Sequence, residues 1–209
     1  MLYSFGIEII LLFVRVLALF SKKTAHFLKV RANSLETIQS KISVNDQVLW
    51  FHCASLGEFE QARPLIESCK KDFPNHRIAL TFFSPSGYEV QKNYAFADVV
   101  TYLPLDRKKS VLRFIEALRP QVLFLIKYEF WPNLISELQK QKIPVFSVAS
   151  IFRKQQLFFK PWGFYMKNIL KKIDFFFVQN EASHAMVVCA ICPCSKVVLK
   201  KSSVIGVGT

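Results

Sequence analysis

From Val44 onward the chain alternates between two kinds of hydrophobic pattern. Short runs rich in β-branched and aromatic residues are followed by longer stretches whose apolar residues recur every three or four positions. This alternation is typical of βαβ units, in which the strands pair in parallel. We therefore predict an α/β domain over residues 44–188, with a parallel sheet flanked by helices. The expected strands are 47–54, 77–83, 98–103, 121–126, 143–149 and 174–179.

A different segment precedes this domain, at residues 1–43. Ile7–Phe20 is apolar except for Glu8 and Arg15, a run too short and too interrupted to predict a spanning helix. It does not resemble a secretory signal either, because no basic residue precedes it and no small-residue cleavage site follows. We expect an interfacial helix, and the alternative is a helix buried on its own domain or on a partner. The basic residues expected to meet anionic headgroups are Lys22, Lys23, Lys29 and Arg31.

The turn after the first expected strand carries a carboxylate. Ser55 precedes Glu58 by three residues, which is the spacing of a capping box at a helix start. A second interpretation follows from topology, because ligands of open α/β sheets bind beyond the carboxyl ends of the strands. Glu58 could then meet a substrate and accept a proton, since the helix dipole favours its ionised form. The two roles can coexist in one residue.

Turns after later strands hold further polar groups. Ser84-Pro85-Ser86-Gly87 offers hydroxyls and backbone donors to a sugar or phosphate oxygen, although ordinary turn chemistry explains these residues equally well. Asp106 follows the third strand, where an N-cap residue is expected. Glu129 again places a carboxylate beyond a strand end. For the helix after the first strand, Pro64 indicates either a start near Arg63 or a kink within a longer helix.

The charge is strongly basic and concentrated in one segment. The formal net charge is +13, and residues 104–172 hold 14 basic and 4 acidic side chains. An acidic partner is implied, either a nucleic acid or an anionic membrane surface with its phosphorylated lipids. Basic and aromatic residues interleave after Arg153, which fits single-stranded nucleic acid, a lipid phosphate, or a solvated basic surface around an aromatic core.

Five motifs in order along the chain resemble the signature of 3-deoxy-D-manno-octulosonic acid (Kdo) transferases. They are Ser-Leu-Gly-Glu-Phe-Glu-x-Ala-Arg-Pro at 55–64, Phe-Ser-Pro-Ser-Gly-Tyr-Glu at 83–89, Tyr-Leu-Pro-Leu-Asp at 102–106, Tyr-Glu-Phe-Trp-Pro-Asn-Leu at 128–134 and Phe-Val-Gln at 177–179. The resemblance covers the first half of such an enzyme. It implies that residues 44–188 are the Rossmann-like, acceptor-binding N-terminal domain of a GT-B type glycosyltransferase, preceded by a membrane-associated helix.

The resemblance also implies an activity. Members transfer Kdo from CMP-Kdo to the lipid A precursor, lipid IVA, in lipopolysaccharide core biosynthesis at the cytoplasmic face of the inner membrane. Glu58 corresponds to the general base of an inverting reaction that needs no metal and no cofactor. Nucleic acid is not an expected partner. The expected substrate-binding residues are Ser55, Gly57, Ser86, Gly87, Glu129 and Arg153.

Two basic residues, Arg153 and Lys127, bear on the site that the resemblance implies. Arg153 is the residue expected on an acceptor phosphate, because a guanidinium matches phosphate geometry. Lys127 departs from the family pattern, in which an acidic residue often occupies this position, so the local charge is reversed.

The tail at residues 189–209 does not resemble the family's continuation. We expect a frameshift or truncation there, so that the C-terminal CMP-Kdo-binding domain is absent; the alternative function is an inactive remnant that binds only lipid acceptor or membrane. The chain has six glycines and no glycine-rich phosphate cradle, so no nucleotide site is expected in this half. Cys189, Cys192 and Cys194 with His184 make a poor zinc pattern, and no metal site is expected.

Overall fold

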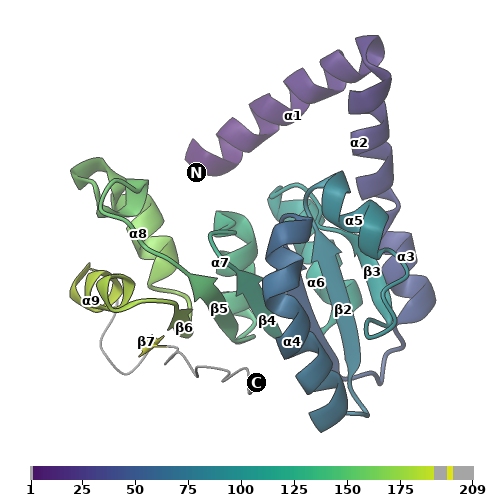
Figure 1. The fold of residues 1–209 in the computed structure, drawn as a ribbon. Coiled ribbons are helices and arrows are strands. Elements are labelled where there is room, and N and C mark those ends of the chain that lie inside the picture. The colour runs from purple at the N-terminus through teal and green to yellow at the C-terminus, as the bar shows by residue number, and fades with distance from the viewer. Residues whose placement is uncertain (1, 191–196, 200–209) are drawn as a thin grey trace, which may run out of the picture.

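In the part of the chain that the structure describes, seven strands lie in one parallel sheet with helices on both of its faces (Figure 1). The structure is a computed structural model and describes residues 2–190 and 197–199. The strand order is β3-β2-β1-β4-β5-β6-β7. The strands are β1 Val48–Cys53, β2 Arg77–Phe82, β3 Val99–Tyr102, β4 Pro120–Ile126, β5 Val145–Ser150, β6 Phe175–Val178 and β7 Val197–Leu199.

The predicted Rossmann-like α/β fold is confirmed. Strand order reverses between β1 and β4, and such a topological switch point is where open α/β sheets bind ligands. Every residue of β1 is buried, as expected of a strand that has helices on both faces. The carboxyl ends of β1 and β4 therefore define the part of the molecule where a site is expected.

The helices cover the two faces with separate hydrophobic clusters. One cluster lies under α4, through Phe59, Ala62 and Ile66, and the other lies under α3, α6, α7 and α8. The helices are α1 Leu2–Phe20, α2 Lys22–Ala32, α3 Ser34–Lys41, α4 Leu56–Asp72, α5 Pro85–Gln91, α6 Lys108–Leu118, α7 Pro132–Lys140, α8 Phe164–Leu170 and α9 Glu181–Ala190, with short 3-10 turns η1 Leu157–Phe159 and η2 Pro161–Gly163. Pro64 lies inside α4, so the longer of the two expected helices is present.

The expected N-cap role of Asp106 is wrong. Arg107 occupies the N-cap position of α6, and the carboxylate of Asp106 instead accepts hydrogen bonds from the backbone N–H groups of Asn133 and Leu134, both at 2.9 Å. These donors belong to the first turn of α7, where backbone N–H groups have no partner within the helix. Asp106 thus stabilises the neighbouring helix rather than its own.

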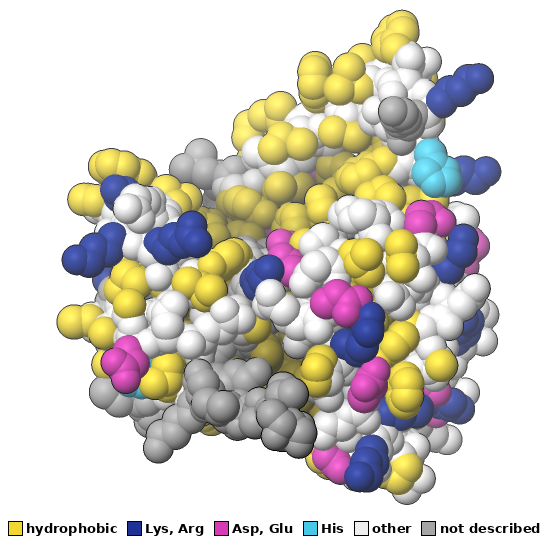
Figure 2. Space-filling view, in the orientation of Figure 1, with side chains coloured by type: hydrophobic (Ala, Val, Ile, Leu, Met, Phe, Trp, Pro, Cys, Tyr) yellow, Lys and Arg dark blue, Asp and Glu magenta, His cyan; other side chains and the backbone are white. Residues whose placement is uncertain are grey.

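The N-terminal helix α1 forms an arm that extends from the body of the molecule (Figure 1). Its Ser4 hydroxyl bonds the side chain of Asn133 at 3.0 Å, and Glu8 pairs with Arg107 at 2.6 Å. Hydrophobic side chains cover much of the outer surface of this arm (Figure 2). By length and composition the segment Tyr3–Phe20 could cross a membrane, with a mean hydropathy of 2.0 and only 6% of the segment buried.

One residue of the expected headgroup-binding set is placed differently. Lys22 and Lys29 are exposed, but Arg31 is only 7% exposed, and its guanidinium lies over the ring of Phe27, 3.6 Å from the centroid. The expectation that Arg31 meets membrane headgroups at the surface is therefore wrong. Stacking on aromatic rings and hydrogen bonds to backbone carbonyls hold it inside the fold.

The tail expected from residue 189 onward falls mostly on residues that the structure does not describe. Within it, Val197–Leu199 forms β7, which pairs with β6 in parallel. Cys53 and Cys69 are buried, and Cys189 is exposed. Cys192 and Cys194, which belong to the cysteine pattern of the tail, lie outside the described residues.

Candidate functional site

The carboxylate of Glu58 lies in the first turn of α4, beyond the carboxyl end of β1. Its Oε2 accepts a hydrogen bond from the backbone N–H of Ala54. The expected capping box is wrong, because the Ser55 hydroxyl makes no capping hydrogen bond and Glu58 reaches back past Ser55 to Ala54. Ser55 occupies the N-cap position in extended conformation. The Glu58 carboxylate is therefore bound by the residue that follows β1, Ala54, and not by the N-cap residue.

Beside this carboxylate, a fully buried histidine connects β1 to the turn after β4. His52 Nδ1 lies 3.1 Å from the carbonyl oxygen of Thr81 and 3.0 Å from its hydroxyl. Both contacts are on the Nδ1 side of the ring, so Nε2 points the other way. His52 Nε2 lies 3.6 Å from Oε2 of Glu129. The imidazole is thus fixed by β2 and directed at the second expected site carboxylate.

Glu129 is held from its other side as well. Its Oε2 accepts a hydrogen bond from the indole N–H of Trp131 at 2.9 Å, and its side chain is 19% exposed. Trp131 in turn packs its ring 5.0 Å from that of Phe83, in the turn after β2. The position of Glu129 is therefore set by the ends of three adjacent strands.

The two carboxylates influence each other electrostatically. Burial raises the pKa of Glu58, the Ala54 N–H lowers it, the negative charge of Glu129 raises it, and His52 and Lys127 lower it. Burial, Glu58 and Glu129 together raise the pKa of the Cys53 thiol well above its usual range. Glu58 and Glu129 therefore lie close enough to interact, and Glu58 keeps its proton to higher pH than an isolated glutamate would.

The backbone at this edge has unusual conformations. Lys127 and Ala149 have φ values of 62° and 58°, in the left-handed region that side chains other than glycine rarely adopt. The hydroxyl of Ser150 donates to the Lys127 carbonyl at 2.8 Å and holds this turn. Such conformations cluster at functional sites. Lys127 also brings a positive charge to this edge, and this charge lowers the pKa of Glu58.

The two glycines of the expected site differ in their surroundings. A Cβ on Gly87 would lie 2.3 Å from the ring of Phe82 and 3.1 Å from the backbone nitrogen of Leu56. Gly87 therefore allows the start of α5 to approach the start of α4. A Cβ on Gly57 would meet nothing within 4 Å, so Gly57 leaves open space above the first turn of α4.

The remaining expected residues lie along the same edge of the sheet. The Ser86 hydroxyl is 2.8 Å from that of Ser84, the N-cap of α5. Arg153 is exposed, and it lines a surface pocket with Tyr128, the residue before Glu129. Among the described residues, neither makes a hydrogen bond or ion pair with the two carboxylates. The structure thus places Ser55, Gly57, Glu58 and Glu129 around one turn and Arg153 further along.

Sequence reasoning did not single out His52 and Thr81, which contact each other beside the two carboxylates. A histidine and a threonine in otherwise apolar strands were the available signal, since a fully buried polar side chain needs a partner. Their pairing across β1 and β2, with Trp50 Nε1 also donating to Thr81 Oγ1 at 2.8 Å, is visible only once the strands are in register.

Residues 26–199 match the sequence profile of a family described as 3-deoxy-D-manno-octulosonic-acid transferase (kdotransferase). The chain belongs to this family. Relatives named 3-deoxy-D-manno-octulosonic acid transferase include proteins of Aquifex aeolicus, 42% identical over 102 residues, and of Haemophilus influenzae, 40% identical over 100 residues. These alignments cover 48% and 47% of this chain but only 28% and 23% of the relatives, so the Kdo transferase match spans about a quarter of their length.

The chain is also similar to a bifunctional enzyme and to a solved structure. A bifunctional glycosyltransferase/methyltransferase of Fusobacterium nucleatum is 30% identical over 150 residues, covering 69% of this chain and 23% of that protein. The solved structure of a UDP-GlcNAc 2-epimerase from Neisseria meningitidis superposes with a TM-score of 0.55 at 14% identity, over 73% of this chain and 46% of that one. At this identity the superposition shows a shared Rossmann-like fold and nothing about chemistry.

Proposed function

We propose that this member of the Kdo transferase family serves the transfer of Kdo from CMP-Kdo to the lipid A precursor, lipid IVA, and that Glu58 is its general base. The observation that carries the proposal is the placement of Glu58 at the sheet's switch point, partly buried and beside a second carboxylate. Family membership supplies the reaction class.

The reaction would proceed in one inverting displacement. Glu58 takes the proton from an acceptor hydroxyl as that oxygen forms a bond to the anomeric carbon of Kdo, and the bond from this carbon to the phosphate oxygen breaks to release CMP. A carboxylate with a raised pKa is a stronger base than an exposed one, which suits the role. The hydrogen bond from Ala54 orients the carboxylate, and the scheme needs neither metal nor cofactor.

The rest of the proposed site follows the sheet edge. Ser55, Gly57 and Ser86 would contact the acceptor sugar near Glu58, and Gly87 would act through the packing of α5. Arg153 would bind an acceptor phosphate. In this scheme CMP-Kdo is held mainly by a second Rossmann-like domain, which must also stabilise the leaving phosphate.

The acceptor is a lipid, so the proposal places the protein at a membrane. We assign it to the cytoplasmic face of the bacterial inner membrane, in contact with the anionic lipid surface through α1. The exposed apolar side chains of α1 and the basic net charge support this location.

The experiment is a transfer assay with CMP-Kdo and lipid IVA on this chain joined to the donor-binding second domain of a family member, measuring CMP release and the mass of the lipid product. CMP-N-acetylneuraminate serves as a control donor with the same nucleotide. The proposal predicts CMP release only with CMP-Kdo and only when lipid IVA is present. Equal CMP release from both donors, or release that ignores lipid IVA, would contradict it.

A second candidate is an acceptor-binding protein without transfer activity. It is favoured by one observation, that the Kdo transferase match spans only 23–28% of the length of the two relatives named above. In the same assay this candidate predicts saturable binding of lipid IVA with no release of CMP. Absence of both binding and release would contradict both candidates.

A further inference from the structure

A cavity of about 340 Å³ lies between the N-terminal helices and α6, away from the carboxylates of the sheet edge. Four arginines line it, each from a different element. They are Arg15 of α1, Arg31 of α2, Arg107 before α6 and Arg113 of α6. No aspartate or glutamate lines the cavity, so it concentrates positive charge in one concave space.

The internal neutralisation of this charge is incomplete. Arg107 pairs with Glu8 at 2.6 Å. Arg15, Arg31 and Arg113 form no ion pair with any carboxylate among the described residues. Three like charges around one cavity repel one another, and a bound anion would remove that repulsion.

Arg31 provides an independent observation. It is only 7% exposed, and buried charges in proteins are normally paired. Its guanidinium donates to the carbonyls of Phe27 and Phe83, but its Nε has no hydrogen-bond partner in the described part of the chain. Burial lowers the pKa of Arg31 to about 10, as expected where no carboxylate compensates the charge.

Apolar side chains line the cavity together with the arginines. They include Leu11, Leu28, Leu35 and Phe114, and Leu11 belongs to the same α1 helix whose outer side exposes hydrophobic residues (Figure 2). Apolar side chains do not stabilise a bound inorganic anion. They do stabilise a phosphate attached to acyl chains, because the acyl chains bury apolar surface against them. The combination of guanidinium groups and leucine side chains therefore fits an amphipathic anion.

We propose that this cavity binds the phosphate group of an anionic membrane lipid, with Arg15 and Arg113 as exposed contacts and Arg31 as the buried one. Guanidinium groups suit this ligand because they form paired, charge-assisted hydrogen bonds with phosphate oxygens. A lipid held here would tie the α1 arm to the body of the molecule. The site needs neither Glu58 nor a sugar donor.

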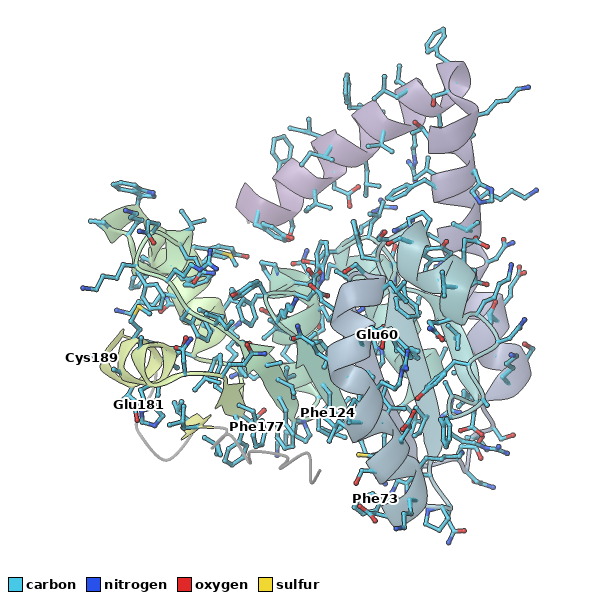
Figure 3. The ribbon with its side chains drawn as sticks, in the orientation of Figure 1. Glu60, Phe73, Phe124, Phe177, Glu181 and Cys189 are labelled. Carbon is cyan, nitrogen blue, oxygen red and sulfur yellow. The ribbon has the colours of Figure 1, made fainter. Side chains whose placement is uncertain are left out.

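The test is calorimetric titration of the full chain with dihexanoyl phosphatidic acid below its micelle concentration. Inorganic phosphate and dihexanoyl phosphatidylcholine are titrated in parallel. The variant combines Arg15→Gln with Arg113→Gln, two exposed residues whose replacement leaves the core intact. Its matched control, called the Lys71 variant, combines Lys71→Gln with Lys142→Gln and so also removes two exposed positive charges outside the cavity, Lys71 lying beside Phe73 at the far end of α4 (Figure 3).

The proposal predicts that the double variant weakens phosphatidic acid binding by about 10- to 100-fold, because two charge-assisted contacts are lost, while the Lys71 variant binds like the wild type. Equal weakening by both variants would show general attraction to a basic protein and overturn the site. Equal affinity for phosphatidylcholine would overturn the phosphate contact. Inorganic phosphate binding as tightly as the lipid would retain the arginine site but overturn its lipid ligand.

Lipid binding in this cavity does not depend on the transfer reaction. Glu58→Gln should leave phosphatidic acid binding unchanged, since Glu58 does not line the cavity. If the wild-type chain does not bind phosphatidic acid but CMP release occurs in the transfer assay, only this inference is overturned. If it binds phosphatidic acid but no CMP is released, only the proposed function is overturned.

Discussion

Glu58 experiences opposing influences on its proton affinity. Burial and the charge of Glu129 raise its pKa, while the Ala54 N–H, His52 and Lys127 lower it. A general base works best when its pKa approaches the operating pH without passing it. The surrounding charges therefore set the pH at which Glu58 becomes able to accept a proton, and they can be changed one at a time.

The acid limb of the transfer reaction should follow these charges. Glu129→Gln removes a negative neighbour, so the pKa of Glu58 falls and activity persists to lower pH. Lys127→Gln removes a positive neighbour and should move the limb to higher pH. Rates measured against pH for both variants test this, and shifts of the same sign in the two variants would contradict the charge assignment.

Asp106 should make folding stability depend on pH. Burial raises its pKa from 3.8 to about 6, so its protonated form is favoured in the folded state. Stability from this group is complete below about pH 4 and is lost as pH rises to about 6, a loss of about 2 to 3 kcal/mol. The Asp106→Asn variant should lack this loss, as measured by urea unfolding at several pH values.

The control for Asp106 is Asp72→Asn, an exposed carboxylate at the end of α4. The same unfolding measurements on this variant show whether loss of any carboxylate changes the pH dependence or only loss of Asp106. If the difference between wild type and Asp106→Asn is constant with pH, the carboxylate of Asp106 does not retain its proton as described.

At the scale of elements, two glycines where α4 and α5 begin differ in the space around them. Gly87→Ala would press a methyl group against the ring of Phe82, and we expect a loss of about 1 to 3 kcal/mol in the free energy of unfolding. Gly57→Ala meets open space and should be neutral or stabilising by up to about 1 kcal/mol.

Chemical denaturation of the two glycine variants checks the stabilities, and a titration with acceptor checks the site. Gly57→Ala should weaken acceptor binding if the acceptor passes over the first turn of α4. A destabilised Gly57→Ala variant together with an unaffected Gly87→Ala variant would reverse the roles given to them here.

The sequence predicted elements well and their long-range partners poorly. The run around Trp50 and Phe51 predicted β1 because an apolar, aromatic stretch suits a strand with both faces covered. The same logic placed Glu58 and Glu129 beyond strand ends. It could not show that Asp106 serves α7, since that contact joins residues 27 and 28 positions apart.

The partners of polar residues inside apolar segments could not be predicted from the sequence either. The sequence gives no register between β1 and β2, so the pairing of His52 with Thr81 was not predictable. Arg31 looked like a surface cation because its helix neighbours Lys22 and Lys29 are basic. Its burial depends on Phe83 and Tyr102, which come from other elements.

At the scale of the whole molecule, the α1 arm has two different sides. Tyr3, Ser4 and Glu8 bond to the body through Asp106, Asn133 and Arg107. The rest of its surface exposes large apolar residues, among them Leu12 and Phe13, each 63% exposed. A helix tied on one side and apolar on the other is suited to lie at a membrane surface.

Replacing Leu12 and Phe13 by serine should therefore affect membrane binding and not folding. Loss of two apolar side chains from a lipid interface should lower affinity for anionic vesicles by about 10- to 100-fold. Val44→Ser with Val90→Ser, two exposed residues outside the arm, is the control. Cosedimentation with vesicles measures the effect, and an equal loss in both double variants would contradict a specific role for the arm.

The five motifs acquire a common location only in the folded molecule. The motifs at 55–64, 83–89, 102–106 and 128–134 follow or complete β1, β2, β3 and β4, and the motif at 177–179 completes β6, so all meet at the carboxyl edge of one sheet. That edge, with Glu58 at its switch point, is the basis of the proposed transfer chemistry.

The most direct test of this account is the turnover of Glu58→Gln per folded molecule, compared with Glu60→Gln in the same transfer assay. Glu60 lies on the same helix (Figure 3), exposed and paired with Arg63, so it matches the charge change without touching the site. A general base predicts a loss of about 100- to 10,000-fold for Glu58→Gln and no comparable loss for Glu60→Gln. Undiminished turnover by a folded Glu58→Gln variant would contradict the assignment and leave Glu58 with a structural role at the start of α4.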